Sequence, residues 1–316
     1  LTYAGRLQLP TQAAGLSRII PQPYLKYLQG SSVINGEVLV DNQGLQRFTL
    51  NSPMTGMAVN LPAPMTKIAA QTQNMNFVLL RPPLTREQAA QPLEGTLRWQ
   101  DRLSARLRLR DRGGIHSAAI QWGERVPTLG TQSGWWLFGD FPSLNWDEWQ
   151  PIVSELSEVA QDPVTGLEVG QGSLDNTATL PLRMVDINSP KLTAFGQQWG
   201  QVHVQLTSPS IPGALNVLRL TGEHVHGNVQ WLPISAGTRG NFVADLDRLH
   251  LNIKNLRGKV PEEAKEGEPV AFVPTPIINP AQWPAIQLEC QDLRVGGEKL
   301  GALSLSTTQI EGGLQI

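Results

Sequence analysis

Short stretches in which apolar and polar residues alternate recur along this chain. The stretch at residues 103–110 reads LSARLRLR, so that leucine or alanine alternates with serine or arginine. Because successive side chains of a β-strand leave opposite faces, this alternation predicts a strand with one apolar and one polar face. The same pattern returns around Val202, Leu249 and Leu303, and it therefore extends over most of the chain.

Roughly ten residues separate successive predicted strands, and Gly, Pro, Asn or Asp bounds most of them. Such spacing is typical of antiparallel all-β proteins. The segment KLTAFGQQWGQVHVQL, which begins at Lys191, aligns with DLRVGGEKLGALSLST, which begins at Asp292. Each segment predicts a strand, a glycine turn and a returning strand, so we expect a stack of similar hairpins.

Helical patterns are few, and the clearest covers residues 145–160. Trp149, Ile152 and Val153 fall on one face of this predicted helix. Pro151 favours a late start, because proline is tolerated only near the first turn of a helix. We expect this helix and a few shorter ones beside the strands.

The composition argues against nucleic acid as a partner. Only 16% of the residues are charged, the formal net charge is −2, and lysine and arginine are scattered rather than clustered. The single cysteine, Cys290, excludes an internal disulfide and is predicted to be a small buried apolar residue. The longest uncharged runs are broken by proline and glycine, so no membrane-spanning helix is predicted. Because the chain starts at Leu1 and stops inside a strand-like pattern, we expect it to be a piece of a longer protein.

Candidate catalytic and metal-binding residues are sparse. His224 and His226 lie two residues apart on one predicted strand face, but no cysteine or carboxylate with matching placement accompanies them. Asp147 and Glu148 suit the first turn of the predicted helix, where carboxylates interact favourably with the helix dipole. No metalloprotease, serine-hydrolase, P-loop or Cys-X-X-Cys motif occurs. We therefore expect no enzyme, no catalytic residue, no metal and no cofactor.

Alternation alone does not say what covers the apolar faces. They can pack against a second sheet as a dry core, or they can line an open groove. The nine tryptophans leave open a carbohydrate-binding or carbohydrate-cleaving β-sandwich, because their rings can stack on sugars. A structural scaffold, such as a β-sandwich or solenoid, is a further alternative.

Several motifs occur in an order that is shared with a known family. They are GRLQL, PYLKYLQGSSVINGEVLV, FTLNSPMTGMAVNLPAPMTK and GWWLFGDFPSLNWDEW, followed by the two glycine hairpins. The third motif carries the family's LP-x-P and lysine as Leu61, Pro62, Pro64 and Lys67. In these motifs and their order, over most of the chain, the sequence resembles the YhdP family of AsmA-like proteins of Gram-negative bacteria.

The resemblance implies a mainly β fold in which an elongated, strongly curved antiparallel sheet forms an open hydrophobic groove. It also implies a bridge-like, non-enzymatic protein of the periplasm that carries phospholipid between the inner and outer membranes. The expected partners are phospholipid acyl chains and, through parts of a longer protein, both membranes, with an N-terminal inner-membrane helix upstream. Self-association through exposed sheet edges is expected as well.

The strand pattern and the resemblance together predict one continuous module. It comprises a β-groove segment over residues 1–144, a helix over 145–162 and a second β-groove segment over 163–316. The helix is expected to pack on or into the groove, and a gating role is left open. The residues expected to line the groove are Leu97, Trp99, Leu103, Leu107, Leu109, Val202, Val204, Leu206, Val229, Trp231, Leu249, Leu251, Ile253, Leu288, Leu303 and Leu305.

Overall fold

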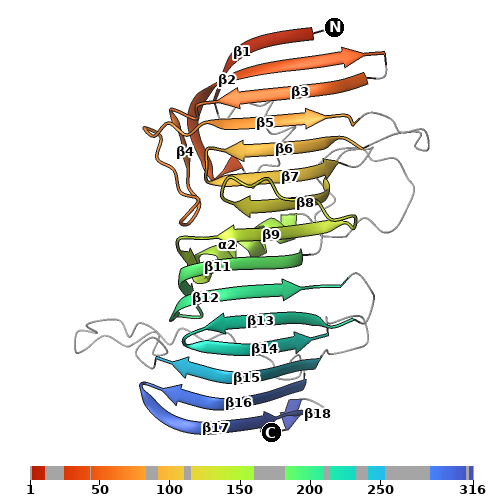
Figure 1. The fold of residues 1–316 in the computed structure, drawn as a ribbon. Helices are drawn as coiled ribbons and strands as arrows, with labels where there is room; N and C mark the ends of the chain where they lie inside the picture. The colour runs from red at the N-terminus through yellow and green to blue at the C-terminus, as the bar shows by residue number, and fades with distance from the viewer. Residues whose placement is uncertain are drawn as a thin grey trace. The chain divides into compact units, whose positions relative to one another are not determined.

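The protein is mainly β, as the strand pattern predicts (Figure 1). The computed structural model describes residues 2–10, 25–42, 44–82, 92–109, 115–159, 182–209, 214–232, 241–252, 285–310 and 313–315. The chain divides into two compact units, Leu1–Ser189 and Pro190–Ile316, and the boundary falls within strand β11 (Leu182–Ala194). The predicted subdivision into residues 1–144, 145–162 and 163–316 stays a prediction.

The first unit combines a sheet with the helix α2. Its strands are β1 (Thr2–Pro10), β2 (Leu28–Asp41), β3 (Gly44–Ser52), β4 (Met57–Val59), β5 (Met75–Leu80), β6 (Glu94–Trp99), β7 (Leu103–Leu109), β8 (Ile115–Trp122), β9 (Gly134–Asp140), β10 (Leu144–Asn145) and the start of β11. Neighbouring strands from β1 to β8 pair antiparallel, whereas β8 with β9 and β9 with β11 pair in parallel. The connection at residues 123–133 is long enough to return the chain to the start of β8 for parallel pairing.

Helix α2 spans Trp146–Val159, close to the predicted range. The Asn145 side-chain amide, just before it, donates a hydrogen bond to Glu148 Oε1 at 2.7 Å. The helix begins at Trp146 and contains Pro151 beyond its first turn, so the predicted late start is wrong. Its ring is exposed, and its missing N–H removes only a bond to the first-turn carbonyl of Asp147, so the helix tolerates it.

The second unit continues from the end of β11. Its strands are β12 (Gln197–Thr207), β13 (Asn216–Gly222), β14 (Val225–Trp231), β15 (Asn241–Leu251), β16 (Ala285–Val295), β17 (Glu298–Ser306), β18 (Thr308–Ile310) and β19 (Gly313–Gln315). β15 and β16 pair in parallel, and the other registered pairs from β12 to β17 are antiparallel. β18 and β19 form a separate hairpin.

The internal repeat predicted from the sequence corresponds to two similar hairpins. One joins β11 to β12, and the other joins β16 to β17. Gly200 and Gly301, which align in the two segments, have φ angles of +69° and +93°. Only glycine adopts this left-handed region without strain, which explains its presence at the same place in both hairpins.

A side-chain amide bridges distant strands of the second unit. Gln197, at the start of β12, accepts a hydrogen bond from the Asn252 N–H at 2.8 Å and donates one to the Asn252 carbonyl at 3.1 Å. β13 and β14 lie between β12 and β15 in the strand order, and their turn lies opposite Val202 and Leu249, so these bonds pass beyond the turn of that hairpin. Three spacings of about 4.8 Å separate β12 from β15 in a flat sheet, so the two strands must bend toward each other here. The predicted fold class, a mainly β protein with a curved and mostly antiparallel sheet, is confirmed.

Candidate functional site

Strand register aligns apolar side chains in rows across the first unit. Residues that pair directly in a sheet point to the same face. Row 1 consists of Ser52, Met75, Trp99, Leu103 and Trp122, row 2 of Leu50, Phe77, Leu97, Ala105 and Ile120, and row 3 of Phe48, Leu79, Gly95, Leu107 and Ala118. Neighbouring rows are about 7 Å apart, because a strand rises about 3.4 Å per residue. Together the rows form the apolar face of the first unit.

The opposite face of the same strands is polar. Glu94 forms ion pairs with Arg106 at 3.3 Å and with Arg108 at 2.9 Å. The Asn76 amide donates a hydrogen bond to Asn51 Oδ1 at 2.6 Å. Beside them lies a hollow of about 600 Å³, whose polar lining includes Asn35, Asn51, Asn74, Asn76, Arg98, Gln100 and Asp101. The two faces therefore differ as the alternation predicts.

The second unit has an apolar face of the same kind. Row 4 consists of Val204, Leu220, Gly227, Leu246, Cys290 and Leu303, and row 5 consists of Leu206, Leu218, Val229, Ala244, Leu288 and Leu305. Row 6 consists of Trp231, Phe242 and Ile286. This face is thus apolar across six neighbouring strands.

The described residues of the predicted lining set lie on these two faces. Rows 1 to 3 contain Leu97, Trp99, Leu103 and Leu107, and Leu109 follows on the same side of β7. Rows 4 to 6 contain Val204, Leu206, Val229, Trp231, Leu288, Leu303 and Leu305, while Val202, Leu249 and Leu251 continue the face along their strands. Ile253 lies outside the described residues. That these side chains line a groove for lipid stays a prediction.

The predicted lining residues differ in exposure. Trp99, Leu103 and Val202 are buried, with 8%, 6% and 0% of their surface exposed. Leu107 and Leu305 are only partly buried. A partly exposed side chain can contact a ligand without rearrangement, whereas a buried one already has protein neighbours on every side. The set therefore divides into packed positions and accessible positions.

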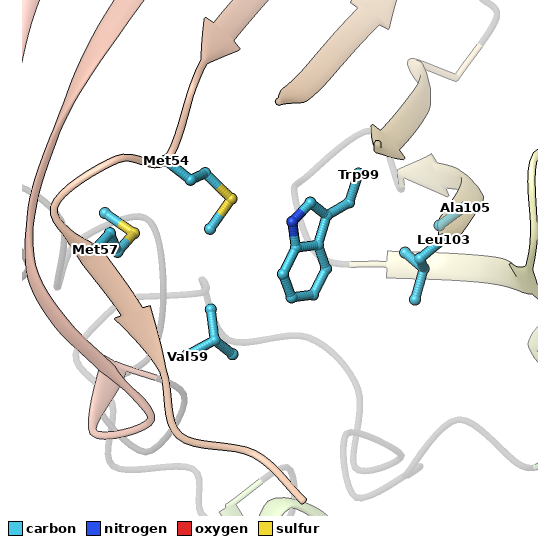
Figure 2. Packing of buried hydrophobic residues seen from close by; sticks show 6 residues of the cluster. All are labelled: Met54, Met57, Val59, Trp99, Leu103 and Ala105. Carbon is cyan, nitrogen blue, oxygen red and sulfur yellow. The ribbon is translucent and has the colours of Figure 1, made fainter. Parts of the chain in front are cut away.

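A second layer covers rows 1 and 2 of the first unit. Residues 53–73, which connect β3 to β5 and include β4, leave the sheet and fold over it, and we call them the cap. Met54, Met57 and Val59 of the cap pack in one cluster with Trp99 and Leu103 (Figure 2). Other members and neighbours of the cluster are Ala105, Leu28, Leu61, Met65, Met75, Leu97, Ile120 and Trp122. Rows 1 and 2 supply these sheet residues and row 3 supplies none, so the cap fills the face at these positions of rows 1 and 2.

Lys67 lies inside the cap with only 1% of its surface exposed. Its Nζ donates hydrogen bonds to the backbone carbonyls of Met54 at 2.7 Å, Met57 at 2.6 Å and Ile68 at 3.1 Å. An ammonium group has three N–H donors, so these bonds satisfy all of them. Burial lowers the pKa of Lys67 from its ordinary value of 10.5. The sequence gives no signal of this burial, because lysine is almost always exposed.

The cap is joined closely to β2. β4 pairs antiparallel with the first residues of β2, where Gly30 has a φ angle of +96°. A Cβ atom on Gly30 would lie 2.1 Å from the carbonyl oxygen of Gly56, so the two backbones approach each other too closely for any side chain. At the base of the cap, the hydroxyls of Thr55 and Thr72 are 2.9 Å apart and hydrogen-bonded.

Helix α2 packs beside the cap. Trp149 donates its indole N–H to the Ala63 carbonyl at 3.1 Å. Glu155 accepts hydrogen bonds from Lys26 and from the Tyr27 hydroxyl, the latter at 3.1 Å. The bond from Lys26 lowers the pKa of Glu155. These contacts fit the packing interpretation of the predicted helix.

Several tryptophans contribute to packing rather than to an exposed aromatic surface. Trp99 is buried under the cap. Trp199 is 9% exposed and donates its indole N–H to the Ala194 carbonyl at 3.0 Å. Trp122 stacks on Phe141 with ring centroids 5.4 Å apart. The buried rings of Trp99 and Trp199 are therefore not available as a platform for sugars.

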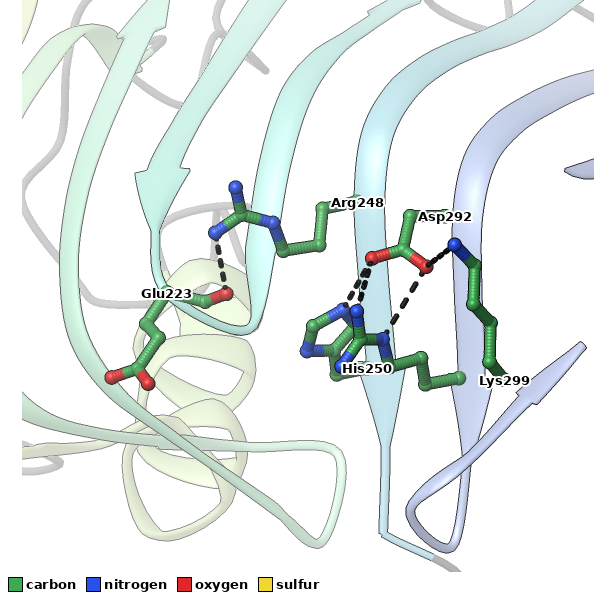
Figure 3. A network of polar contacts seen from close by, with 6 residues as sticks. Glu223, Arg248, His250, Asp292 and Lys299 are labelled. Atoms are coloured by element: carbon green, nitrogen blue, oxygen red, sulfur yellow. Dashed lines mark hydrogen bonds and ion pairs between the residues drawn. The ribbon is translucent and has the colours of Figure 1, made fainter. Parts of the chain in front are cut away.

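A polar network lies at one end of β15, β16 and β17 (Figure 3). Asp292 is paired with Arg294 at 3.2 Å, with His250 Nε2 at 3.2 Å and with Lys299 at 3.9 Å. These partners, Arg294 foremost, lower the pKa of the Asp292 carboxyl. The ring of His224 lies 5.9 Å from that of His250. Within the described ranges, no three histidine, cysteine or acidic residues are grouped so that they could hold a metal ion.

Two residues of row 4 show what alternation can and cannot reveal. Cys290 is 2% exposed, so the prediction of a small buried residue is confirmed, and burial raises the pKa of its thiol. Leu246 is 6% exposed on the same face, yet it is not among the residues that the alternation predicts for this face. The register between β14 and β15 shifts beside Gly227, so Leu246 and Leu249, three residues apart, share one face.

In the part of the chain that is described, no helix is both long and apolar enough to cross a membrane. Comparison with curated proteins and with solved structures finds no match. The family model described as "YhdP protein" matches residues 1–316. The match covers the motifs, the two hairpins and both apolar faces, and the chain belongs to the YhdP family.

Proposed function

We propose that this chain is a segment of a non-enzymatic conduit that carries phospholipid between the inner and outer membranes of a Gram-negative envelope. One observation carries the proposal. In each unit, strand register collects apolar side chains on a single face, and part of that face, around Leu107 and around Leu305, is only partly buried.

The proposal follows from the cost of exposing an acyl chain to water. Burial of one methylene group is worth about 0.8 kcal/mol, so a chain of about 16 carbons gains on the order of 13 kcal/mol on leaving water. A carrier must offer that gain at every position along the path. A continuous aliphatic face meets this need, and no catalytic group is required.

The location and partners belong to the same proposal. Acyl chains would contact the apolar faces, and headgroups would stay in water. The periplasm is the compartment in which such a path joins two membranes, and contacts with the membranes would be made by other parts of a longer protein. Family membership supports this proposal.

A matched pair of variants on β17 tests it. Leu305 lies in row 5, and its neighbour Ser304 is exposed on the opposite face. Purified protein is incubated with dipalmitoyl phosphatidylethanolamine vesicles, re-isolated and examined by native mass spectrometry. We expect the wild type and Ser304→Asp to retain phospholipid and Leu305→Asp to lose at least tenfold, because a carboxylate beside an acyl chain loses its hydration. Equal retention by the two variants, or none by the wild type, would contradict the proposal.

A further inference from the structure

We propose that the cap, held in place by Lys67, excludes acyl chains from the side chains that it covers in rows 1 and 2 of the first unit and confines them to the partly buried Leu107 and Leu109 of β7. This inference rests on the proposed function and specifies where the lipid lies. Lys67 is thus a positioning residue, since it acts through the cap and does not touch the lipid.

The packing of the cap supplies the first support. Met54, Met57 and Val59 are 6%, 8% and 3% exposed, and their partners Trp99 and Leu103 are equally buried. Protein interiors are close-packed, so an acyl chain has no space between these side chains unless the cap moves. Row 3, about 7 Å beyond row 2, has no member in this cluster. Its Leu79 and Ala118 are buried, whereas Leu107 is only partly buried.

The hydrogen bonds of Lys67 supply the second support. Lys67 and Ile68 lie in the second half of the cap, where the chain returns to β5, and Met54 and Met57 lie in the first half and contact the sheet. The Lys67 ammonium group bonds to the carbonyls of all three neighbours and so holds the two halves together. Two backbone hydrogen bonds between Val59 and Lys67, at 2.8 and 3.0 Å, connect the same two halves of the cap. No carboxylate of the described chain pairs with Lys67, so its charge is balanced only by carbonyl dipoles. Loss of the ammonium group therefore removes three bonds from the cap and none from the sheet.

The cap can open without unfolding the sheet beneath it. The strands under it, β3 and β5 to β8, form their ladders with one another and not with the cap. The cap is bonded to the rest of the unit mainly through β2 and through Trp149 of α2. A weakened cap would thus expose rows 1 and 2 while the rows themselves stay in register.

Photo-crosslinking maps where the lipid lies. The full chain is loaded from vesicles of phosphatidylethanolamine that carries a diazirine at the end of one acyl chain, irradiated and digested, and the adducts are located by mass spectrometry. We expect wild-type adducts at Leu107 and Leu109 and on the second unit, and none at Trp99 or Leu103. In Lys67→Met we expect adducts at Trp99 and Leu103 to rise at least fivefold, with those on the second unit unchanged.

The control is Lys299→Met, which removes a lysine whose side chain is 67% exposed and which should leave the map unchanged. Wild-type adducts at Trp99 or Leu103 as frequent as those at Leu107 would overturn the inference, and this measurement needs no folded variant. A folded Lys67→Met protein with an unaltered map would overturn it as well. Adducts on neither apolar face would instead refute the proposed function.

Discussion

Truncation of Leu103 and of Leu107 separates packing from lipid contact. Both residues lie on the apolar face of β7, four residues apart. Leu103 is 6% exposed beneath the cap, whereas Leu107 is only partly buried and lies outside the cap cluster. Alanine at position 103 should therefore weaken folding, and alanine at position 107 should weaken lipid retention.

The expected magnitude follows from the burial of Leu103. Leucine to alanine removes three carbon groups, worth about 2.4 kcal/mol when buried at about 0.8 kcal/mol each. The cavity left under Met54 and Met57 adds to this cost, so we expect Leu103→Ala to lower the free energy of unfolding by about 3–4 kcal/mol. At Leu107 the transfer is incomplete and no closed cavity forms, so about 1–1.5 kcal/mol is expected.

Urea unfolding of the two variants, followed by tryptophan fluorescence, measures these losses. The m-value should not change, since both native states bury the same surface. Native mass spectrometry of bound phospholipid supplies the second measurement, in which Leu107→Ala should lose more lipid than Leu103→Ala. Equal losses of stability, or a larger loss of lipid in Leu103→Ala, would refute the division of the face into packed and accessible positions.

Further predictions concern both units. Val204→Asp in a transport-competent protein should block phospholipid passage while circular dichroism stays unchanged, and normal transport would contradict the second apolar face. Gly30→Ala should lower the thermal midpoint by several degrees more than Gly44→Ala, because both glycines have a positive φ but only Gly30 lacks space for a Cβ. Asp292, whose pKa is lowered mainly by Arg294, should stabilise the second unit above pH 3.8 and lose this contribution as the pH falls through its lower folded value. In Asp292→Asn that part of the acid-induced loss of stability should disappear.

Alternation predicts which residues share a face wherever a strand is regular. It places Val204, Leu206 and Leu107 on the apolar faces, as observed, because successive side chains along a strand point to opposite faces of the sheet. It fails at bulges, where one extra residue changes the parity, as between Leu246 and Leu249.

The cap could not be predicted in the same way. Its segment MAVNLP has the composition of a strand, and β4 is indeed one. Whether a strand joins a sheet or covers it depends on tertiary packing, which local sequence does not contain. The burial of Lys67 depends on the same packing, and so does the filling of the face at Trp99. The parallel pairing of β15 with β16 depends on the long intervening connection and is equally hidden from local patterns.

The bridge between Gln197 and Asn252 has a mechanical consequence. One neutral amide provides both a donor and an acceptor to a single backbone unit, much as a partner strand would, and Gln197 is 3% exposed. To flatten the sheet between β12 and β15, both bonds must break and a buried amide must lose its partners, which costs about 1–3 kcal/mol for each unsatisfied group. The Gln197–Asn252 bridge should therefore stiffen this unit against flattening of its sheet between β12 and β15.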